Sequence, residues 1–137
     1  MNRRALVISV MLSGIIGVST LTGCNGTLSS GNESGSYQQI DAEQAKELMD
    51  SEHDCVILDA RTQPEFDEGH IPGAVLLPHD QVTAEAESLL PQKEQMILVY
   101  CRSGNRSKQA ASVLVDLGYT NVIEFGGINS WPYEIER

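Results

Sequence analysis

Short, continuous apolar runs alternate along this chain with longer segments whose apolar residues recur at helical spacing. The short runs are typical of buried strands, and the longer segments are typical of helices that cover a sheet. We expect strands at residues 56–58, 75–77, 96–100 and 119–125, and helices from residue 42, at 64–69, at 82–90, after Arg106 and near 128–131. The alternation predicts an α/β fold, with a central parallel sheet and helices on both faces.

Local signals mark where several of these helices begin and end. Asp41 is a typical N-cap residue, and Gln44 stands at the position that completes a capping box. Ala45, Leu48 and Met49 then fall on the side of that helix expected to be buried. Pro64 and Gly69 bound the next short helix, and Pro91 ends the third.

Cys101 stands where the most apolar strand gives way to a helix. Peptide N–H groups in such a loop, and in the first helical turn, have no partners within the helix and favour negative charge. Arg102, Arg106 and Lys108 add positive potential, and Gly104 gives the backbone freedom that a tight cradle of N–H groups requires. We therefore expect a thiol with a lowered pKa. The alternative is an inert cysteine packed at the end of a core strand.

The remaining loop residues, Ser103, Asn105 and Ser107, are short and polar. Such side chains hydrogen-bond to nearby backbone and suit a turn that leads into a helix N-cap. Cations at a helix N-terminus oppose its dipole, so something anionic should compensate the basic residues around the loop.

Charge and length narrow the class of partner. The 137 residues suffice for one domain with a core, and their net charge is −10, from 9 basic and 19 acidic residues. So acidic a chain is a poor partner for nucleic acid. Because three of its few basic residues cluster at the cysteine loop, a small anionic substrate fits better.

The other cysteines and the histidines predict neither a disulfide framework nor a metal site. Cys24, Cys55 and Cys101 form no CxxC pair, and no histidine lies at ligand spacing from them. We expect Cys55 to be buried as a packed strand residue. His70 could act as a base, but a structural role in a turn is favoured.

Residues 1–23 have the pattern of a secretion signal, with Arg3 and Arg4 before an apolar stretch. Leu21-Thr22-Gly23-Cys24 resembles a bacterial lipobox, which implies cleavage before Cys24 and lipid attachment to it. Residues 24–36 then form a Gly/Ser-rich linker that spans roughly 20 Å. These features predict a protein that is lipid-anchored to a membrane of the cell envelope and extracytoplasmic. An uncleaved membrane helix is the alternative.

Four motifs lie in one order along residues 37–137, and together they resemble a single-domain rhodanese. They are Asp59-Ala60-Arg61, then Glu65-Phe66 with Gly69-His70-Ile71-Pro72-Gly73-Ala74, then Tyr100-Cys101-Arg102-Ser103-Gly104-Asn105-Arg106-Ser107, and finally Gly126-Gly127 with Trp131. The resemblance implies a rhodanese-like fold and a sulfurtransferase. It implies no cofactor.

The resemblance also implies roles for particular residues. Cys101 is the nucleophile that takes the outer sulfur of thiosulfate, or of a similar donor, and holds it as a persulfide. Arg102 attracts the anionic donor, and the loop from Arg102 through Ser103, Gly104 and Asn105 to Arg106 binds the transferred sulfur through its N–H groups. A thiol or cyanide then accepts the sulfur.

Two acidic residues are expected to support the loop. Asp59 is the candidate partner of Arg106, and Glu65 is that of Arg61, so that Asp59 and Arg61 serve as structural support.

Loop length separates this activity from related chemistry. Four residues lie between Cys101 and Arg106, whereas phosphatases and arsenate reductases of the related fold have five. The smaller ring suits one added sulfur better than a tetrahedral oxyanion.

Two non-sulfurtransferase alternatives remain. One is a catalytically silent rhodanese-like module that binds a partner or senses sulfur species at the cell surface. The other is a thiol redox protein, which would need a resolving cysteine. A monomer is the default expectation, and an exposed low-pKa thiol outside the cytoplasm would be open to oxidation.

Overall fold

The computed structural model describes residues 36–137. The predicted signal peptide, Cys24 and all but the last residue of the predicted linker lie outside the described residues. Within residues 36–137, no helix combines the length and apolar character needed to cross a bilayer.

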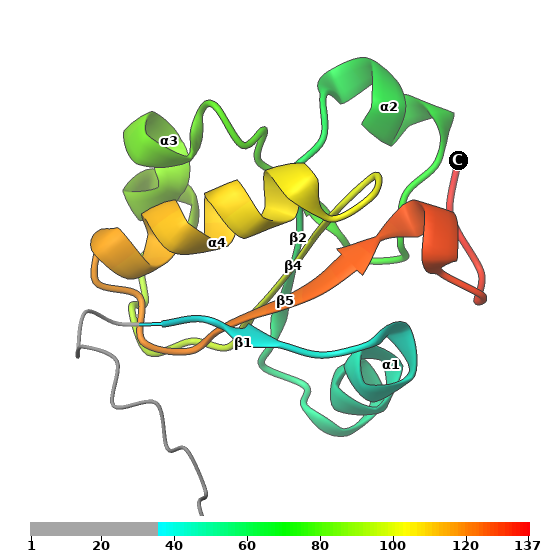
Figure 1. Ribbon diagram of the computed structural model, residues 1–137, viewed down its shortest axis with the longest axis horizontal. Coiled ribbons are helices and arrows are strands. Elements are labelled where there is room, and N and C mark those ends of the chain that lie inside the picture. Colours follow the sequence, from blue (N-terminus) through cyan, green and yellow to red (C-terminus); the bar gives the residue numbers. More distant parts are fainter. Residues whose placement is uncertain (1–35) are drawn as a thin grey trace, which may run out of the picture. The chain divides into compact units, whose positions relative to one another are not determined.

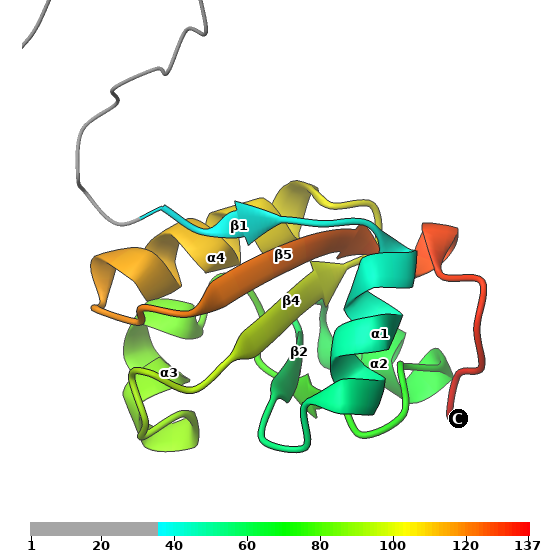
Figure 2. The ribbon, with the colours of Figure 1, turned by 90° about the horizontal axis from the view of Figure 1, so that it is seen from below.

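Five parallel strands form one sheet in the order β1-β5-β4-β2-β3. The chain runs through β1 (Gln38–Gln39), α1 (Ala42–Ser51), β2 (Val56–Asp59), α2 (Gln63–Glu68), β3 (Val75–Leu76), α3 (Val82–Leu89), β4 (Ile97–Cys101), α4 (Asn105–Asp116), β5 (Val122–Gly127) and a 3₁₀ turn, η1 (Ile128–Ser130). Figure 2 shows β1 at one edge and β4 in the interior of the sheet. The predicted α/β fold is confirmed.

Helices cover both faces of the sheet, with α3 and α4 on one face and α1 on the other (Figure 1). Strand β4 faces both layers, because successive side chains of a strand point to opposite sides. Leu98 and Tyr100 pack in the α1 layer, whereas Val99 and Cys101 pack in the layer of α3 and α4. All five residues of β4 are buried, so packing on both faces fixes the position of the strand end from which the cysteine loop begins.

The helix signals act as expected. The Asp41 side chain accepts a hydrogen bond from Gln44 N, and the Gln44 side chain accepts one from Asp41 N, which completes the capping box. Ala45 is buried, while Leu48 and Met49 are half-buried on the same layer. Helix α2 likewise has proline in its first turn and ends at Gly69.

Two features differ from the sequence predictions. Strand β1 was not expected, because Gln38 and Gln39 are exposed and polar and are held only by pairing with β5. Cys55 precedes β2 instead of packing within it, and its side chain is only half-buried. Partial burial still raises the pKa of this thiol.

Candidate active site

The site is built at the carboxyl end of β4, where open α/β sheets place their ligands. Cys101 ends the strand, and Gly104, with φ of 105°, turns the chain into α4 as its N-cap. The backbone N–H of Gly104 donates to Cys101 Sγ at 3.0 Å. A φ of 105° lies in the left-handed region, which glycine adopts without steric cost. This conformation lets the loop turn tightly, with its N–H group facing the sulfur.

Opposing effects act on the ionisation of Cys101. Burial raises the pKa of the thiol, but hydrogen bonds from Ser107 and from the N–H groups of Gly104 and Ser103 outweigh burial and lower it below its usual value. This is the predicted direction. The residue is only 1% exposed, contrary to the expectation of an exposed thiol.

The loop side chains divide into exposed and paired groups. Ser103 and Asn105 are exposed, and the Arg102 side chain is 65% exposed. The Arg102 guanidinium makes one long ion pair, with Nη1 at 3.9 Å from Glu65 Oε1. Arg106 instead turns to Glu65 on α2, and its two guanidinium nitrogens donate to the carboxylate at 2.7 and 2.8 Å. Glu65 is therefore the anionic group that compensates the basic loop.

The predicted partners of the two arginines were wrong. Arg61, and not Arg106, pairs with Asp59, donating from Nε at 3.0 Å and from Nη2 at 2.7 Å. Asp59 is fully buried and also accepts from Arg61 N and from the Tyr100 hydroxyl, at 2.9 and 2.6 Å. The pairs are exchanged because both Asp59 and Arg61 lie inside at the end of β2, whereas Glu65 lies on α2 beside the loop.

This buried cluster supports the strand end that carries the cysteine. Asp59 is in register with Tyr100, the residue before Cys101, and the Tyr100 hydroxyl also accepts from Ile71 N at 3.1 Å. Burial and the neighbouring Asp59 carboxylate raise the pKa of Tyr100, so it remains a hydrogen-bond donor. Asp59 and Arg61 thus have the structural surroundings expected of supporting residues, although by a different pairing.

Gly127 allows the loop to lie against β5. A Cβ atom at this position would lie 2.6 Å from Ser103 N and still closer to the Arg102 carbonyl group. Asn129 N donates to the same carbonyl oxygen of Arg102 at 3.2 Å. The loop is therefore held from β5 by a close backbone contact that only glycine permits.

Sequence reasoning missed the role of Glu124 near the site. This carboxylate is 3% exposed on β5 and accepts from the Ser107 hydroxyl at 2.6 Å. Ser107 was expected only to help the turn, yet it is buried and is one of the groups that lower the pKa of Cys101. The available signal was a single charged residue inside an otherwise apolar strand.

His70 has the structural surroundings that were favoured for it. Its Nδ1 lies 3.0 Å from Phe66 O, and its ring stacks on Phe66 with centroids 3.7 Å apart. Its Nε2 lies 3.5 Å from a carboxylate oxygen of Glu136. Both ring nitrogens therefore have partners within α2 and the C-terminal segment.

Cys55 cannot serve Cys101 as a resolving cysteine in this fold. Both are free thiols, and Cys55 directly precedes β2, whose first residue pairs with Ile97 at the start of β4. Cys101 is four residues further along β4, which is about 13 Å. A disulfide requires Cα atoms within about 7 Å.

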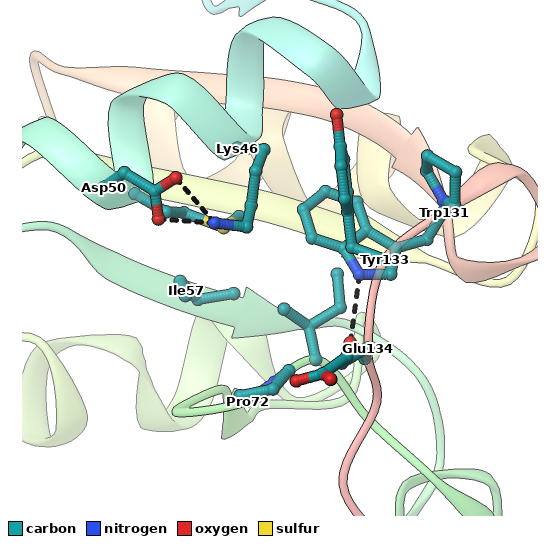
Figure 3. Close-up of a pocket in the computed structure, with 10 residues that line it drawn as sticks. Lys46, Asp50, Ile57, Pro72, Trp131, Tyr133 and Glu134 are labelled. Carbon is teal, nitrogen blue, oxygen red and sulfur yellow. Dashed lines mark hydrogen bonds and ion pairs between the residues drawn. The ribbon is translucent and has the colours of Figure 1, made fainter.

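The structure also contains a cavity of about 670 Å³, whose lining residues are drawn in Figure 3. It is bordered by α1 residues Lys46 and Asp50, by Ile57 of β2 and by the C-terminal residues Trp131 and Tyr133. None of residues 101–106 lines it. The candidate site is therefore the small amide cradle around Cys101 and not this cavity.

Replacing Glu65 by glutamine should loosen the loop in a pH-dependent way. The bidentate pair with Arg106 lowers the pKa of Glu65, so its stabilisation is present above the unfolded value of 4.5 and is lost as pH falls below it. We expect E65Q to cost about 1 kcal/mol at neutral pH, with the difference from wild type shrinking below about pH 4.5. Urea unfolding across pH measures this.

The exposed pair of Glu87 and Lys93 on the surface offers a matched control. E87Q should leave the alkylation rate of Cys101 unchanged, whereas E65Q should alter it. A free-energy difference between E65Q and wild type that stays constant down to pH 3 would show that the ion pair does not stabilise the loop.

Comparison with known proteins extends over most of the described chain. A family model described as a rhodanese-like domain matches residues 41–133. A protein named sulfurtransferase from Allochromatium vinosum is 34% identical over 94 residues, which cover 68% of this chain and 86% of that protein.

Two further relatives widen the comparison. An adenylyltransferase and sulfurtransferase, UBA4, from Meyerozyma guilliermondii is 33% identical over 120 residues, which are 82% of this chain but only 28% of that longer protein. A solved Escherichia coli structure described as rhodanese with anions is 28% identical, with a TM-score of 0.57, covering 61% of this chain and 98% of that one. Most of the chain thus has relatives whose names specify sulfur transfer.

Proposed function

Since this chain belongs to the rhodanese-like family, we propose that it is a sulfurtransferase that carries a sulfane sulfur as a persulfide on Cys101. The observation that supports this best is the thiol itself. Its pKa is lowered by hydrogen bonds from Ser107, Gly104 and Ser103 although it is buried, so it can be ionised where an added sulfur would also meet N–H donors.

The proposed reaction has two displacements that balance without a cofactor. The Cys101 thiolate attacks the outer sulfur of thiosulfate, the S–S bond of the donor breaks, and sulfite leaves with the electron pair. A second nucleophile, cyanide in an assay or a thiol in a cell, then attacks the outer sulfur of the persulfide. The Cys101 thiolate leaves and is ready for another cycle.

Charge and loop size support a small anionic sulfur donor. Arg106 is already neutralised by Glu65, so the 65% exposed Arg102 is the loop cation available to a donor. The four-residue spacing between Cys101 and Arg106 also favours one added sulfur over a phosphate. We propose thiosulfate as the representative donor and Arg102 as the residue that attracts it.

Removing the Arg102 charge should weaken donor binding and leave the chemistry largely intact. We expect R102A to raise KM for thiosulfate about tenfold, which corresponds to about 1.4 kcal/mol, with a smaller change in kcat. The matched control is K108A, which removes an exposed cation near the start of α4. This variant should change KM less. An unchanged KM in R102A would place the donor elsewhere.

The overall proposal is tested by assaying two reactions on the same preparation. We expect thiocyanate to form from thiosulfate and cyanide, with one sulfite released per thiocyanate, and hydrolysis of an aryl phosphate to be absent. Phosphate hydrolysis without thiocyanate formation would favour the phosphatase alternative. Absence of both reactions would favour a silent binding module.

We further propose that the protein is a lipoprotein of the cell envelope, with lipid on Cys24 and the domain outside the cytoplasm. The lipobox-like segment and the Gly/Ser-rich residues after it support this proposal. Globomycin should block processing in cells, and C24A should abolish the incorporation of labelled palmitate into the protein. A membrane-bound protein that is never processed and takes up no palmitate would favour an uncleaved helix.

A further inference from the structure

Glu124 is a buried carboxylate for which the proposed reaction has no use. It is 3% exposed, and no ion pair joins it to a Lys, Arg or His side chain within residues 36–137. Its partners are donors: the Ser107 hydroxyl at 2.6 Å, Gly126 N at 2.8 Å and Gln39 Nε2 at 3.3 Å. A set made of donors suits an ionised carboxylate, which only accepts.

Ser107 connects this carboxylate to the nucleophile. Its hydroxyl is one of the groups that lower the pKa of Cys101, yet this hydroxyl has one proton and several oxygens also accept it. The oxygens are Glu124 Oε1 at 2.6 Å, Gly104 O at 2.9 Å and Gly126 O at 3.2 Å. Because a bond to an ionised acceptor is roughly twice as strong as a neutral one, the Glu124 carboxylate competes with the sulfur for this proton more strongly than the two carbonyl groups do.

Glu124 therefore opposes the thiolate in two ways. It competes for the hydroxyl proton that Ser107 shares with the sulfur, and it adds a second negative charge beside the cradle, 2.6 Å from the Ser107 oxygen. The charged residues on either side of Ser107 on α4 are Arg106, whose guanidinium is paired with Glu65, and Lys108, whose side chain is exposed. No cation among the described residues therefore cancels the effect of Glu124 directly.

We propose that Glu124, acting through Ser107, limits how strongly the cradle stabilises the Cys101 thiolate and so balances sulfur uptake against sulfur release. This inference rests on the proposed sulfur transfer. In uptake, Cys101 is the attacking group, and a more strongly stabilised thiolate attacks more slowly. In release, Cys101 is the leaving group, and the same stabilisation makes it leave faster. Glu124 is thus a positioning residue with opposite effects on the two displacements.

The isosteric variant E124Q tests this directly. Glutamine can keep the contacts with Ser107 and Gly126 but is a neutral acceptor. We expect the Cys101 thiol pKa, measured from the pH dependence of iodoacetamide alkylation, to fall by about one unit. The two displacements are then compared at a pH above the Cys101 pKa of both the wild type and E124Q. In E124Q, persulfide formation from thiosulfate should slow about threefold, and thiocyanate release from the preloaded persulfide should quicken by a similar factor.

A merely structural role gives a different pattern. If E124Q only loosens the loop, the thiol pKa rises and both displacements slow, which would overturn the proposal, as would an unchanged thiol pKa. Thermal unfolding of E124Q checks that the fold is retained. The alkylation measurement does not depend on sulfur transfer. Failure of the wild type to form a persulfide would therefore reject the proposed function separately.

Ser107 provides a second, independent variant. S107A removes the hydroxyl that Glu124 and the sulfur share, so the thiol pKa should rise above the wild-type value, and an unchanged thiol pKa in S107A would contradict the proposal. In the S107A background, the shift caused by E124Q should shrink, because the hydroxyl that transmits part of it is gone. A shift as large as in the wild-type background would show that Glu124 does not act through Ser107.

Discussion

Replacing Cys101 by serine should abolish thiocyanate formation, with a loss of at least about a thousandfold. A serine hydroxyl at this position stays protonated at neutral pH, and the cradle that lowers the pKa of the thiol cannot make it a comparable nucleophile. The substitution changes one buried atom in the layer between β4 and α4, so the domain should still fold. The measurement is thiocyanate formation per folded protein, with folding checked by circular dichroism.

The second described cysteine provides the matched control for this variant. Cys55 is half-buried at the opposite end of the sheet and has no contact with the loop, so C55S should retain wild-type activity. Thiocyanate formation by C101S at the wild-type rate would remove Cys101 from the mechanism. A loss in C55S equal to that in C101S would mean that thiol loss acts through the fold and not through the site.

Replacing Gly127 by alanine should disable the site without changing any reacting group. The added Cβ would lie 2.6 Å from Ser103 N and closer to the Arg102 carbonyl group, and both are backbone atoms that cannot rotate away. The loop must therefore move off β5, and its N–H groups lose their aim at the sulfur. A displacement of about 1 Å at a catalytic group costs roughly a hundredfold in rate, which is the loss expected here.

Gly118 separates this steric effect from ordinary glycine strain. Its φ of 93° makes G118A strained as well, but an added Cβ there meets nothing within 4 Å and the residue lies beyond the far end of α4. We expect G118A to lose about 1 kcal/mol of stability and to retain activity. G127A should also show a thiol pKa that has risen towards the ordinary value. Full activity in G127A would mean that the loop tolerates displacement.

Sequence patterns predicted the features that depend on neighbours along the chain. The capping box of Asp41 and Gln44 was confirmed because its two hydrogen bonds join residues three apart. The strand, loop and helix around Cys101 were predicted for the same reason, since an apolar run, a glycine and a helical run succeed one another. The lowered pKa of Cys101 then results from this local geometry.

Features that depend on tertiary placement were not predictable in the same way. Whether Arg61 or Arg106 pairs with Asp59 depends on where each side chain lies at the carboxyl end of the folded sheet. The spacing of these residues along the chain does not determine that position. Strand β1 consists of two exposed polar residues and has no periodic signal. The link from Glu124 to Ser107 joins residues 17 apart and exists only because β5 packs beside α4.

The central claim is that Cys101 carries the transferred sulfur, and intact-mass spectrometry of the domain after incubation with thiosulfate tests it most directly. The predicted result is a mass gain of one sulfur atom in the wild type that disappears on adding cyanide and is absent from C101S. Absence of this gain with every sulfane donor tried, or the same gain in C101S, would contradict the claim.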